Sequence, residues 1–169
     1  MVEFLVTTGE AVGREIARRI RTIVLPSGMR IAVTAVTRSD RNPVTEPADV
    51  FVTVQESSDR FRLINTCGTV EVTADVPIVV AVDRAVEEEK PLALRDLWAR
   101  IYLALMRDRG VMSGTMNRLV TSIEPVDMIP SIPGPESPRM VARIGFRVRY
   151  EFPTGDPTFV PSDFAEVDP

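Results

Sequence analysis

The sequence predicts an α+β two-layer sandwich, with two amphipathic helices packed on one face of an antiparallel or mixed sheet. Two segments, 70–82 and 140–152, place an apolar residue at every even position. This two-residue period is typical of a strand with one buried face. Two other segments, 8–24 and 92–109, repeat apolar residues at helical spacing. Two long strands and two covering helices therefore define the expected fold.

The first helix is expected over residues 8–24. Thr7 is a suitable N-cap with Glu10 three residues later, and Val12, Ile16 and Ile20 recur four residues apart. Arginines occupy the opposite side of this helix. The run Pro26-Ser27-Gly28 then predicts its end.

Short strands are expected between the first helix and the long strand 70–82, because runs rich in β-branched residues alternate with polar turns. The expected strands cover 30–37, 50–55 and 60–65, the expected turns are Ser57-Ser58-Asp59 and Cys67-Gly68, and a polar loop covers 38–48.

The second helix is the strongest helical pattern, and Gly110 is placed to end it. A short strand over 119–124 is expected next. Five prolines and a glycine between residues 125 and 138 predict an irregular connection to the last strand.

The last strand, 139–152, has two chemically different faces. Its even positions are apolar from Met140 to Phe152, whereas its odd positions carry most of its arginines. The odd positions of the strand 70–82 carry Glu71 and Asp75 instead. If the two long strands pair antiparallel, these acids are expected to meet Arg143 or Arg147 across the strands.

We expect one α+β domain over residues 1–153 and an extended, proline-rich acidic arm over 154–169. No segment is apolar for the roughly 18 residues that a membrane span needs. The first residues lack the basic and small-residue features of a signal peptide. The sequence therefore predicts a protein that acts in a cytoplasm, or in a particle assembled there, without a membrane partner.

The composition argues against most enzymatic mechanisms. The chain has no histidine, so the usual catalytic triads and the usual general base near neutral pH are excluded. Cys67 is the single cysteine, which excludes an internal disulfide framework and thiolate-rich metal sites. We predict a protein that is not an enzyme and has no catalytic residue, cofactor or metal, although carboxylate and arginine chemistry remains an alternative.

The arginine-bearing faces are the main candidate sites. They can be solvated or paired within the chain, form an inter-subunit contact, or bind nucleic acid. The net charge of −4, and aromatic residues that point into the core, argue against nucleic acid. Lys90 is the single lysine, so nearly all basic residues are arginines. This preference reflects either a need for the bidentate contacts that arginine makes or the codon usage of a GC-rich genome. The candidate interface residues are Arg14, Arg18, Arg21, Arg139, Arg143, Arg147 and Arg149.

Two aromatic residues of the C-terminal arm form a second candidate. Phe159 and Phe164 stand isolated in the acidic, proline-rich segment. Such residues can anchor an arm in a pocket of a neighbouring subunit. The alternative is that the arm is simply disordered.

The order of segments resembles the phage tail terminators, also called tail completion or head–tail joining proteins. The residues that carry the resemblance are the opening helix around Val12-Arg14-Glu15-Ile16, the strand that begins Thr69-Val-Glu-Val, the helix 92–109, and the closing strand from Val141 to Phe152. The closing strand ends in Tyr150 just before a Pro/Gly-rich terminus.

The resemblance implies a virion structural protein of the tail or neck, assembled in the host cytoplasm. A homohexameric ring would cap the tail tube, join it to the neck or connector protein and possess no catalytic residues. Tube protein, sheath protein and DNA in passage, without sequence-specific binding, are the other implied partners. Another connector or neck component is the alternative within this class, and a small carboxylate- and arginine-dependent enzyme is the alternative outside it.

Overall fold

The computed structural model describes residues 6–25, 29–35, 49–55, 57–64, 68–82, 90–106, 119–131 and 140–159. Two helices and six strands lie within these residues. In chain order they are α1 (Thr8–Arg21), β1 (Ile31–Ala35), β2 (Val50–Val54), β3 (Ser58–Leu63), β4 (Thr69–Val82), α2 (Lys90–Met106), β5 (Ser122–Ser131) and β6 (Met140–Pro153).

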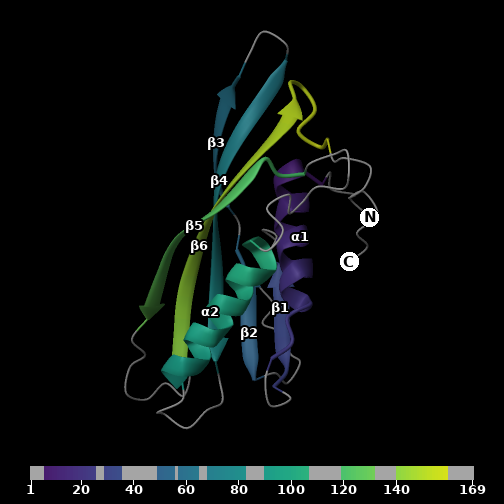
Figure 1. The fold of residues 1–169 in the computed structure, drawn as a ribbon. Coiled ribbons are helices and arrows are strands. Elements are labelled where there is room, and N and C mark those ends of the chain that lie inside the picture. The colour runs from purple at the N-terminus through teal and green to yellow at the C-terminus, as the bar shows by residue number, and fades with distance from the viewer. Residues whose placement is uncertain are drawn as a thin grey trace.

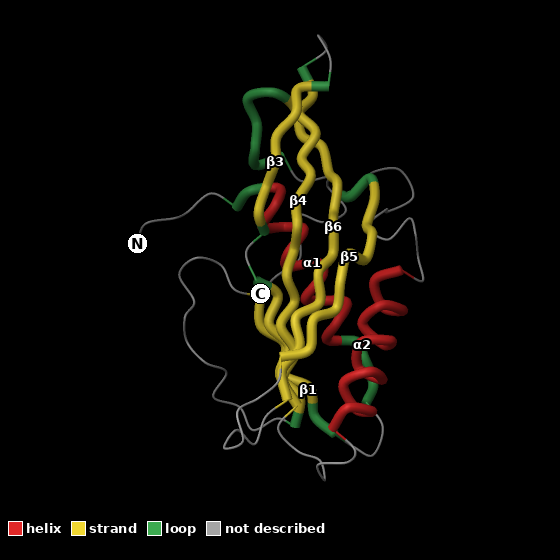
Figure 2. Tube along the Cα trace, turned by 90° about the vertical axis from the view of Figure 1, so that its left-hand side faces the viewer, coloured by secondary structure: helices red, strands yellow, loops and turns green. Residues whose placement is uncertain are grey.

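The six strands form one mixed sheet, in the order β1-β2-β4-β6-β5 with β3 beside β4. The β1–β2 pair is parallel, and every other pair is antiparallel. Both helices lie on the same side of this sheet (Figures 1 and 2). The predicted α+β two-layer fold is therefore confirmed.

The predicted N-terminus of α1 is correct. The Thr7 hydroxyl accepts a hydrogen bond from the Glu10 backbone N–H at 3.2 Å, as an N-cap does. The apolar stripe that includes Val12, Ile16 and Ile20 is buried against the sheet. The helix ends at Arg21 with Thr22 as its C-cap, three residues earlier than expected.

The second helix packs through a leucine-rich face. Its inward residues, Leu94, Leu97, Ile101 and Leu105, are at most 2% exposed. They follow the helical spacing seen in the sequence. The described part of α2 ends at Met106, so the predicted terminator Gly110 lies outside the described residues.

The two long strands form the centre of the core. They pair antiparallel from Thr69 opposite Pro153 to Val82 opposite Met140. Their even residues face the helices, and Ile78, Ile144 and Phe146 are fully buried. Removal of this apolar surface from water is the main stabilising term of such a core.

Two strand boundaries differ from the prediction. Strand β3 begins at Ser58, so Ser58 and Asp59 lie in a strand rather than in a turn. Strand β5 runs from Ser122 to Ser131, where a short strand followed by an irregular connection was expected. Proline cannot donate to a ladder but is accepted on an edge strand, and β5 is an edge of this sheet.

One end of the sheet extends beyond the helices. The β3–β4 hairpin and the adjoining end of β6 project past the N-terminus of α1 (Figures 1 and 2). Residues following β6 return to that N-terminus, where the Thr8 hydroxyl donates to the carbonyl oxygens of Pro157 and Phe159. The helices therefore leave the projecting end of the sheet uncovered.

Candidate protein interface

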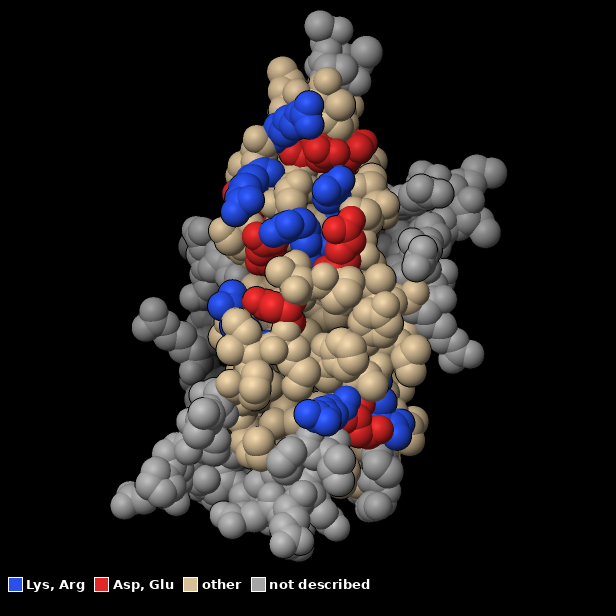
Figure 3. Space-filling model, turned by 60° about the vertical axis from the view of Figure 1, so that its left-hand side comes forward, with Lys and Arg blue, Asp and Glu red and all other residues tan. Residues whose placement is uncertain are grey.

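The sheet face opposite the helices has a charged half at the projecting end. Because paired residues in a sheet share a face, the strand registers arrange its side chains in rows across the strands. Three such rows together hold four arginines and four acids: Arg60, Arg62, Arg147, Arg149, Glu71, Asp75, Glu124 and Glu151. Figure 3 shows blue and red side chains interspersed over this end of the sheet. We call these eight residues the charged half.

Asp75 holds the ion pairs of the charged half, in the row farthest from the β3–β4 turn. Arg147 Nε donates to Asp75 Oδ1 at 2.8 Å, and Arg60 Nη2 lies 3.9 Å from Asp75 Oδ2. The hydrogen bond from Arg147 is the main reason that the pKa of the Asp75 carboxyl lies below its usual value. The predicted contact between Asp75 and Arg147 is therefore confirmed.

Glu71 of β4 was also expected to meet an arginine of β6, but it does not. Glu71 lies opposite Glu151 on β6 and opposite Arg62 on β3. The register decides this outcome, since a pairing of Glu71 with Arg147 would need β6 to slide along β4. Like charges placed directly opposite each other weaken this end of the ladder slightly.

The predicted arginines of β6 do not act as one unit. Arg147 pairs with Asp75, whereas Arg143 and Arg149 form no ion pair with any described residue. Arg143 lies farther down the strand, beside Val79 and Ile129. Arg139 lies outside the described residues.

Sequence reasoning missed two arginines of the charged half. Arg60 and Arg62 project from β3 on the same face as Asp75 and Glu71. The alternation in Arg60-Phe61-Arg62-Leu63 is the signal that identifies them, because a two-residue period places both guanidinium groups on one face.

The remaining part of this sheet face is mostly uncharged. Its residues include Phe51 on β2, Val79 and Ala81 on β4, and Val141 on β6, all partly exposed. Figure 3 shows uncharged side chains below the charged half. Asp127 lies over Gly145 at the boundary, where a Cβ would collide with the Asp127 carboxylate.

The predicted arginines of α1 are bound within the chain. Arg14 Nη2 donates to Glu10 at 2.8 Å, one helical turn away. Arg21 Nη2 donates to the Val33 carbonyl of β1 at 3.4 Å. These contacts show that both side chains have structural partners, although each remains partly exposed.

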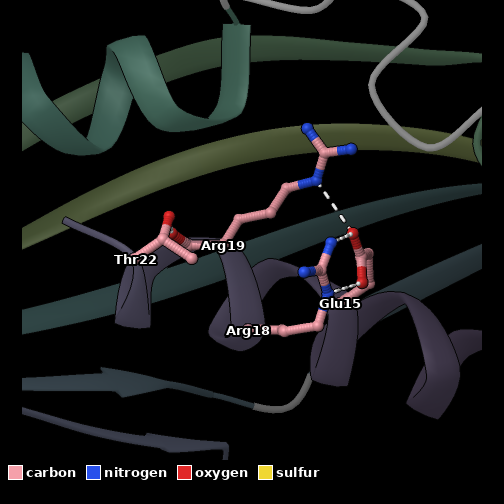
Figure 4. Close-up of polar contacts among 4 residues, drawn as sticks. All are labelled: Glu15, Arg18, Arg19 and Thr22. Carbon is pink, nitrogen blue, oxygen red and sulfur yellow. Dashed lines mark hydrogen bonds and ion pairs between the residues drawn. The ribbon is translucent and has the colours of Figure 1, made fainter.

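Arg18 and Arg19 both reach back to Glu15, which is 2% exposed (Figure 4). Arg18 Nε donates to Glu15 Oε2 at 2.6 Å, and Arg19 Nε donates to Glu15 Oε1 at 2.9 Å. Burial raises the pKa of the Glu15 carboxyl, but the hydrogen bonds and charges of both arginines outweigh burial and lower it overall. This cluster keeps a charge beside the core.

Two apolar side chains of β3 lie uncovered at the projecting end. Phe61 is 67% exposed and Leu63 is 64% exposed, although both point to the same side of the sheet as the core residues Val72 and Val70 that pair with them. The helices end before reaching them (Figure 1). Phe159 is also exposed, whereas Phe164 lies outside the described residues.

A buried tyrosine joins β3 to β6. Tyr150 Oη donates to Asp59 Oδ2 at 3.1 Å, and Ser57 Oγ also donates to Asp59. Burial, followed by the negative charge of Asp59, raises the pKa of the Tyr150 phenol well above its usual value. We interpret these contacts as a structural attachment for β3.

Metal-binding clusters and membrane-spanning helices are both absent from the described residues. Across the described ranges, no three acidic or cysteine side chains gather in a way that would hold a metal ion. No described helix is both long and apolar enough to cross a membrane. The arrangement that remains is a sheet face with mixed charges and an uncovered strand at its edge.

Comparison with known proteins identifies a structural neighbour. No family model and no curated protein matches the sequence. A chain in a solved structure titled "Virion of native gene transfer agent (GTA) particle" has a similar fold, with a TM-score of 0.51 and 14% sequence identity. The alignment covers 81% of this chain and 84% of that chain. The two chains therefore share an architecture over most of their lengths.

Proposed function

We propose that this chain is a structural protein of a phage-like particle and that it acts as a tail terminator. In this role, a ring of identical subunits caps the tail tube and joins it to the neck. The observation that carries the proposal is the shared fold with a chain of a gene transfer agent virion over most of both chains. The order of helices and strands that resembles the tail terminators supports the finer assignment.

The proposed mechanism is geometric and needs no catalytic residue. A ring forms when one surface of each subunit binds a different surface of the next subunit and the rotation between neighbours brings the last subunit back to the first. The charged half and the uncovered end of β3 are available for such contacts, because no described segment covers them. Arginine is also enriched at protein interfaces. A hexamer is the stoichiometry we propose for this ring.

The partners follow from the same role. We propose that one side of the ring contacts the tail tube and, in a contractile tail, the sheath, while the other contacts the neck or connector protein. DNA would pass through the ring without sequence-specific contacts. The finished subunit would be located in the tail or neck of the virion.

The assembly state tests this proposal directly. Light scattering and negative-stain images of the purified chain, alone and with tail tube protein, are expected to show one discrete ring and tubes that end in it. The Arg147→Ala variant measures the contribution of the charged half to ring formation. A chain that stays monomeric in the presence of tube protein would contradict the proposal.

A different neck or tail component would share the fold and the virion location. Co-assembly separates the two roles, because a tail terminator binds the end of the tube whereas a connector binds the portal. Pull-down with purified tube protein and with purified portal protein is expected to recover only the tube protein.

A further inference from the structure

Among the described strands, β1, β3 and β5 each have one edge without a partner strand, and two of these edges are protected against further strand pairing. An edge strand presents unpaired backbone groups to solvent, and proteins block such edges with proline, bulges, short strands or charged side chains. Strand β5 contains Pro125 and Pro130, with a register shift at Val126. Strand β1 has five residues, and Arg21 binds its Val33 carbonyl.

The third edge, β3, is blocked in neither of the two ways seen at β5, although it carries Arg60 and Arg62 on one face. It contains neither proline nor a register shift. The Ile64 N–H donates to the carbonyl of its partner Thr69 at 3.1 Å. Antiparallel partners alternate between bonded and non-bonded pairs, so Arg62 and Arg60 also direct their backbone groups toward β4.

The backbone groups of Phe61 and Leu63 consequently point outward from the sheet. No described residue forms a hydrogen bond with them. On either side of this backbone stand two exposed apolar side chains and two exposed arginines: Phe61 and Leu63 on the helix side, Arg60 and Arg62 on the other. The outer edge of β3 therefore combines backbone groups without a described hydrogen-bond partner and side chains that alternate between apolar and basic.

The strand that already pairs with the inner edge indicates what the outer edge would accept. Strand β4 places Val70 and Val72 beside Leu63 and Phe61, and it places Glu71 beside Arg62. A second strand with the same alternation of apolar and acidic residues would make equivalent contacts on the outer edge. Arg62 forms no ion pair with a described residue, so its charge is available to such a partner.

We propose that the outer edge of β3 binds an extended segment of a partner protein by strand addition, and that this segment alternates apolar and acidic residues. Its backbone would bond to the outward groups of Phe61 and Leu63. Its apolar side chains would cover the exposed Phe61 and Leu63 rings and methyl groups, while its acids would face Arg60 and Arg62. Charge complementarity thus selects the partner.

Pairings of β3 with a second copy of itself that are centred on Phe61, Arg60 or Arg62 oppose like charges. A two-fold antiparallel pairing centred on Phe61 would place Arg60 of one copy directly opposite Arg62 of the other. Pairings centred on either arginine would oppose identical charges. Like charges in such positions destabilise a strand pair, so a different, acidic segment is the expected occupant.

This inference rests on the proposed function in one respect, because a particle protein must bind neighbours and β3 would supply one of those contacts. The binding itself is measurable without a particle. A suitable probe is a blocked, fluorescent peptide with the sequence of residues 69–75, Thr-Val-Glu-Val-Thr-Ala-Asp. Fluorescence anisotropy with the full chain is expected to show saturable binding.

The charge requirement is tested with a second peptide that carries Glu71→Lys and Asp75→Lys. The wild-type chain is expected to bind the acidic peptide roughly tenfold more tightly than this lysine peptide, since each cross-strand charge pair contributes modestly. The double variant Arg60→Gln, Arg62→Gln is expected to lose most of this preference. A scrambled peptide of the same composition controls for attraction by charge alone.

The backbone requirement is tested with Phe61→Pro. Proline removes the outward N–H of residue 61, whereas the inner ladder uses the N–H groups of its neighbours. Peptide binding is expected to be lost while circular dichroism and the melting temperature change little. Phe61→Val is the matched control, because it keeps the N–H and a strand-forming side chain.

Two results would overturn the inference: an absence of saturable binding to the wild-type chain, or unchanged binding by a folded Phe61→Pro variant. Should the Phe61→Pro variant unfold, the Arg60→Gln, Arg62→Gln variant provides the test. An unchanged preference of that variant for the acidic peptide over the lysine peptide would overturn the inference, and a lost preference would support it. Mass spectrometry of purified particles tests the proposed function separately. Peptide binding by a chain absent from particles would refute only the function, and particle incorporation without peptide binding would refute only the inference.

Discussion

The two faces of the central strand pair come from alternate residues of the same two strands, yet they have opposite physical roles. On the helix side, Ile78, Ile144 and Phe146 are fully buried. On the other side, Asp75 and Arg147 remain more than a third exposed and form a surface ion pair. A buried face contributes most of the stability, whereas an exposed face is left available for contacts with other proteins. Changes on the two faces are therefore expected to have very different effects.

The largest difference is expected between neighbouring residues of β6. Phe146→Ala removes a fully buried ring and is expected to lower the free energy of unfolding by about 3–5 kcal/mol. Arg147→Ala, one residue later and on the other face, is expected to change the free energy of unfolding far less, because water screens an exposed ion pair. Urea denaturation of both variants measures the contrast, and similar losses would contradict it.

Glu15 is a charge on the buried side and sharpens the comparison. Glu15→Gln weakens three hydrogen bonds from Arg18 and Arg19 and is expected to cost about 2 kcal/mol at neutral pH. Because folding lowers the pKa of Glu15, its stabilisation is present above the unfolded value of 4.5 and is lost as the pH falls through the folded value.

The pH dependence provides a separate measurement of the same residue. The wild-type free energy of unfolding is expected to fall below about pH 4.5, and Glu15→Gln should reduce that slope. Urea titrations from pH 3 to pH 7, extrapolated linearly to zero denaturant, compare the two proteins. Parallel curves for both would show that Glu15 does not carry this effect.

Two glycines of α1 test how closely the helix approaches the sheet. A Cβ on Gly9 would lie 2.6 Å from Tyr150 Oη, which Asp59 holds in place. Gly9→Ala is therefore expected to cost about 1.5 kcal/mol, as overpacking does. Gly13 has no atom within 4 Å of such a Cβ, so Gly13→Ala is expected to stabilise by about 0.5–1 kcal/mol through helix propensity. Thermal denaturation should give shifts of opposite sign.

The smallest expected effect lies on the exposed face. A double-mutant cycle with Asp75→Asn and Arg147→Ala is expected to give a small coupling energy that decreases further at high salt. A coupling energy that is large and independent of salt would mean that this pair is shielded from water, in conflict with its exposure.

Much of the fold was predictable because burial leaves a periodic mark on the sequence. The even residues of β4 and β6 and the four-residue spacing of α1 indicate buried faces directly. The ends of β3 and β5 were mispredicted because local signals point to turns: Ser58 and Asp59 are turn formers, and Pro125 and Pro130 interrupt a ladder. Only the position of β5 at the sheet edge makes its prolines acceptable.

The candidate interface was predictable only in part. Alternation identifies the arginine face of β6, but it does not reveal which arginine has a partner. The register pairs Arg147 with Asp75 and leaves Arg143 and Arg149 without an ion pair among the described residues. The two arginines of α1 differ in the same way. Arg14 binds Glu10, one turn away in the same helix, whereas Arg21 binds the Val33 carbonyl of β1, a contact that the composition does not predict.

The sequence by itself determined which face of each long strand and helix is apolar, because the periods of apolar residues match the geometry of strands and helices. Only the tertiary structure decided where the helices end relative to the sheet, and hence which apolar residues of the inner face stay uncovered. Phe61 and Val72 face the same side, yet Phe61 is 67% exposed and Val72 is buried. The physical reason is that burial depends on what packs against a face, and a residue's own period does not contain that information.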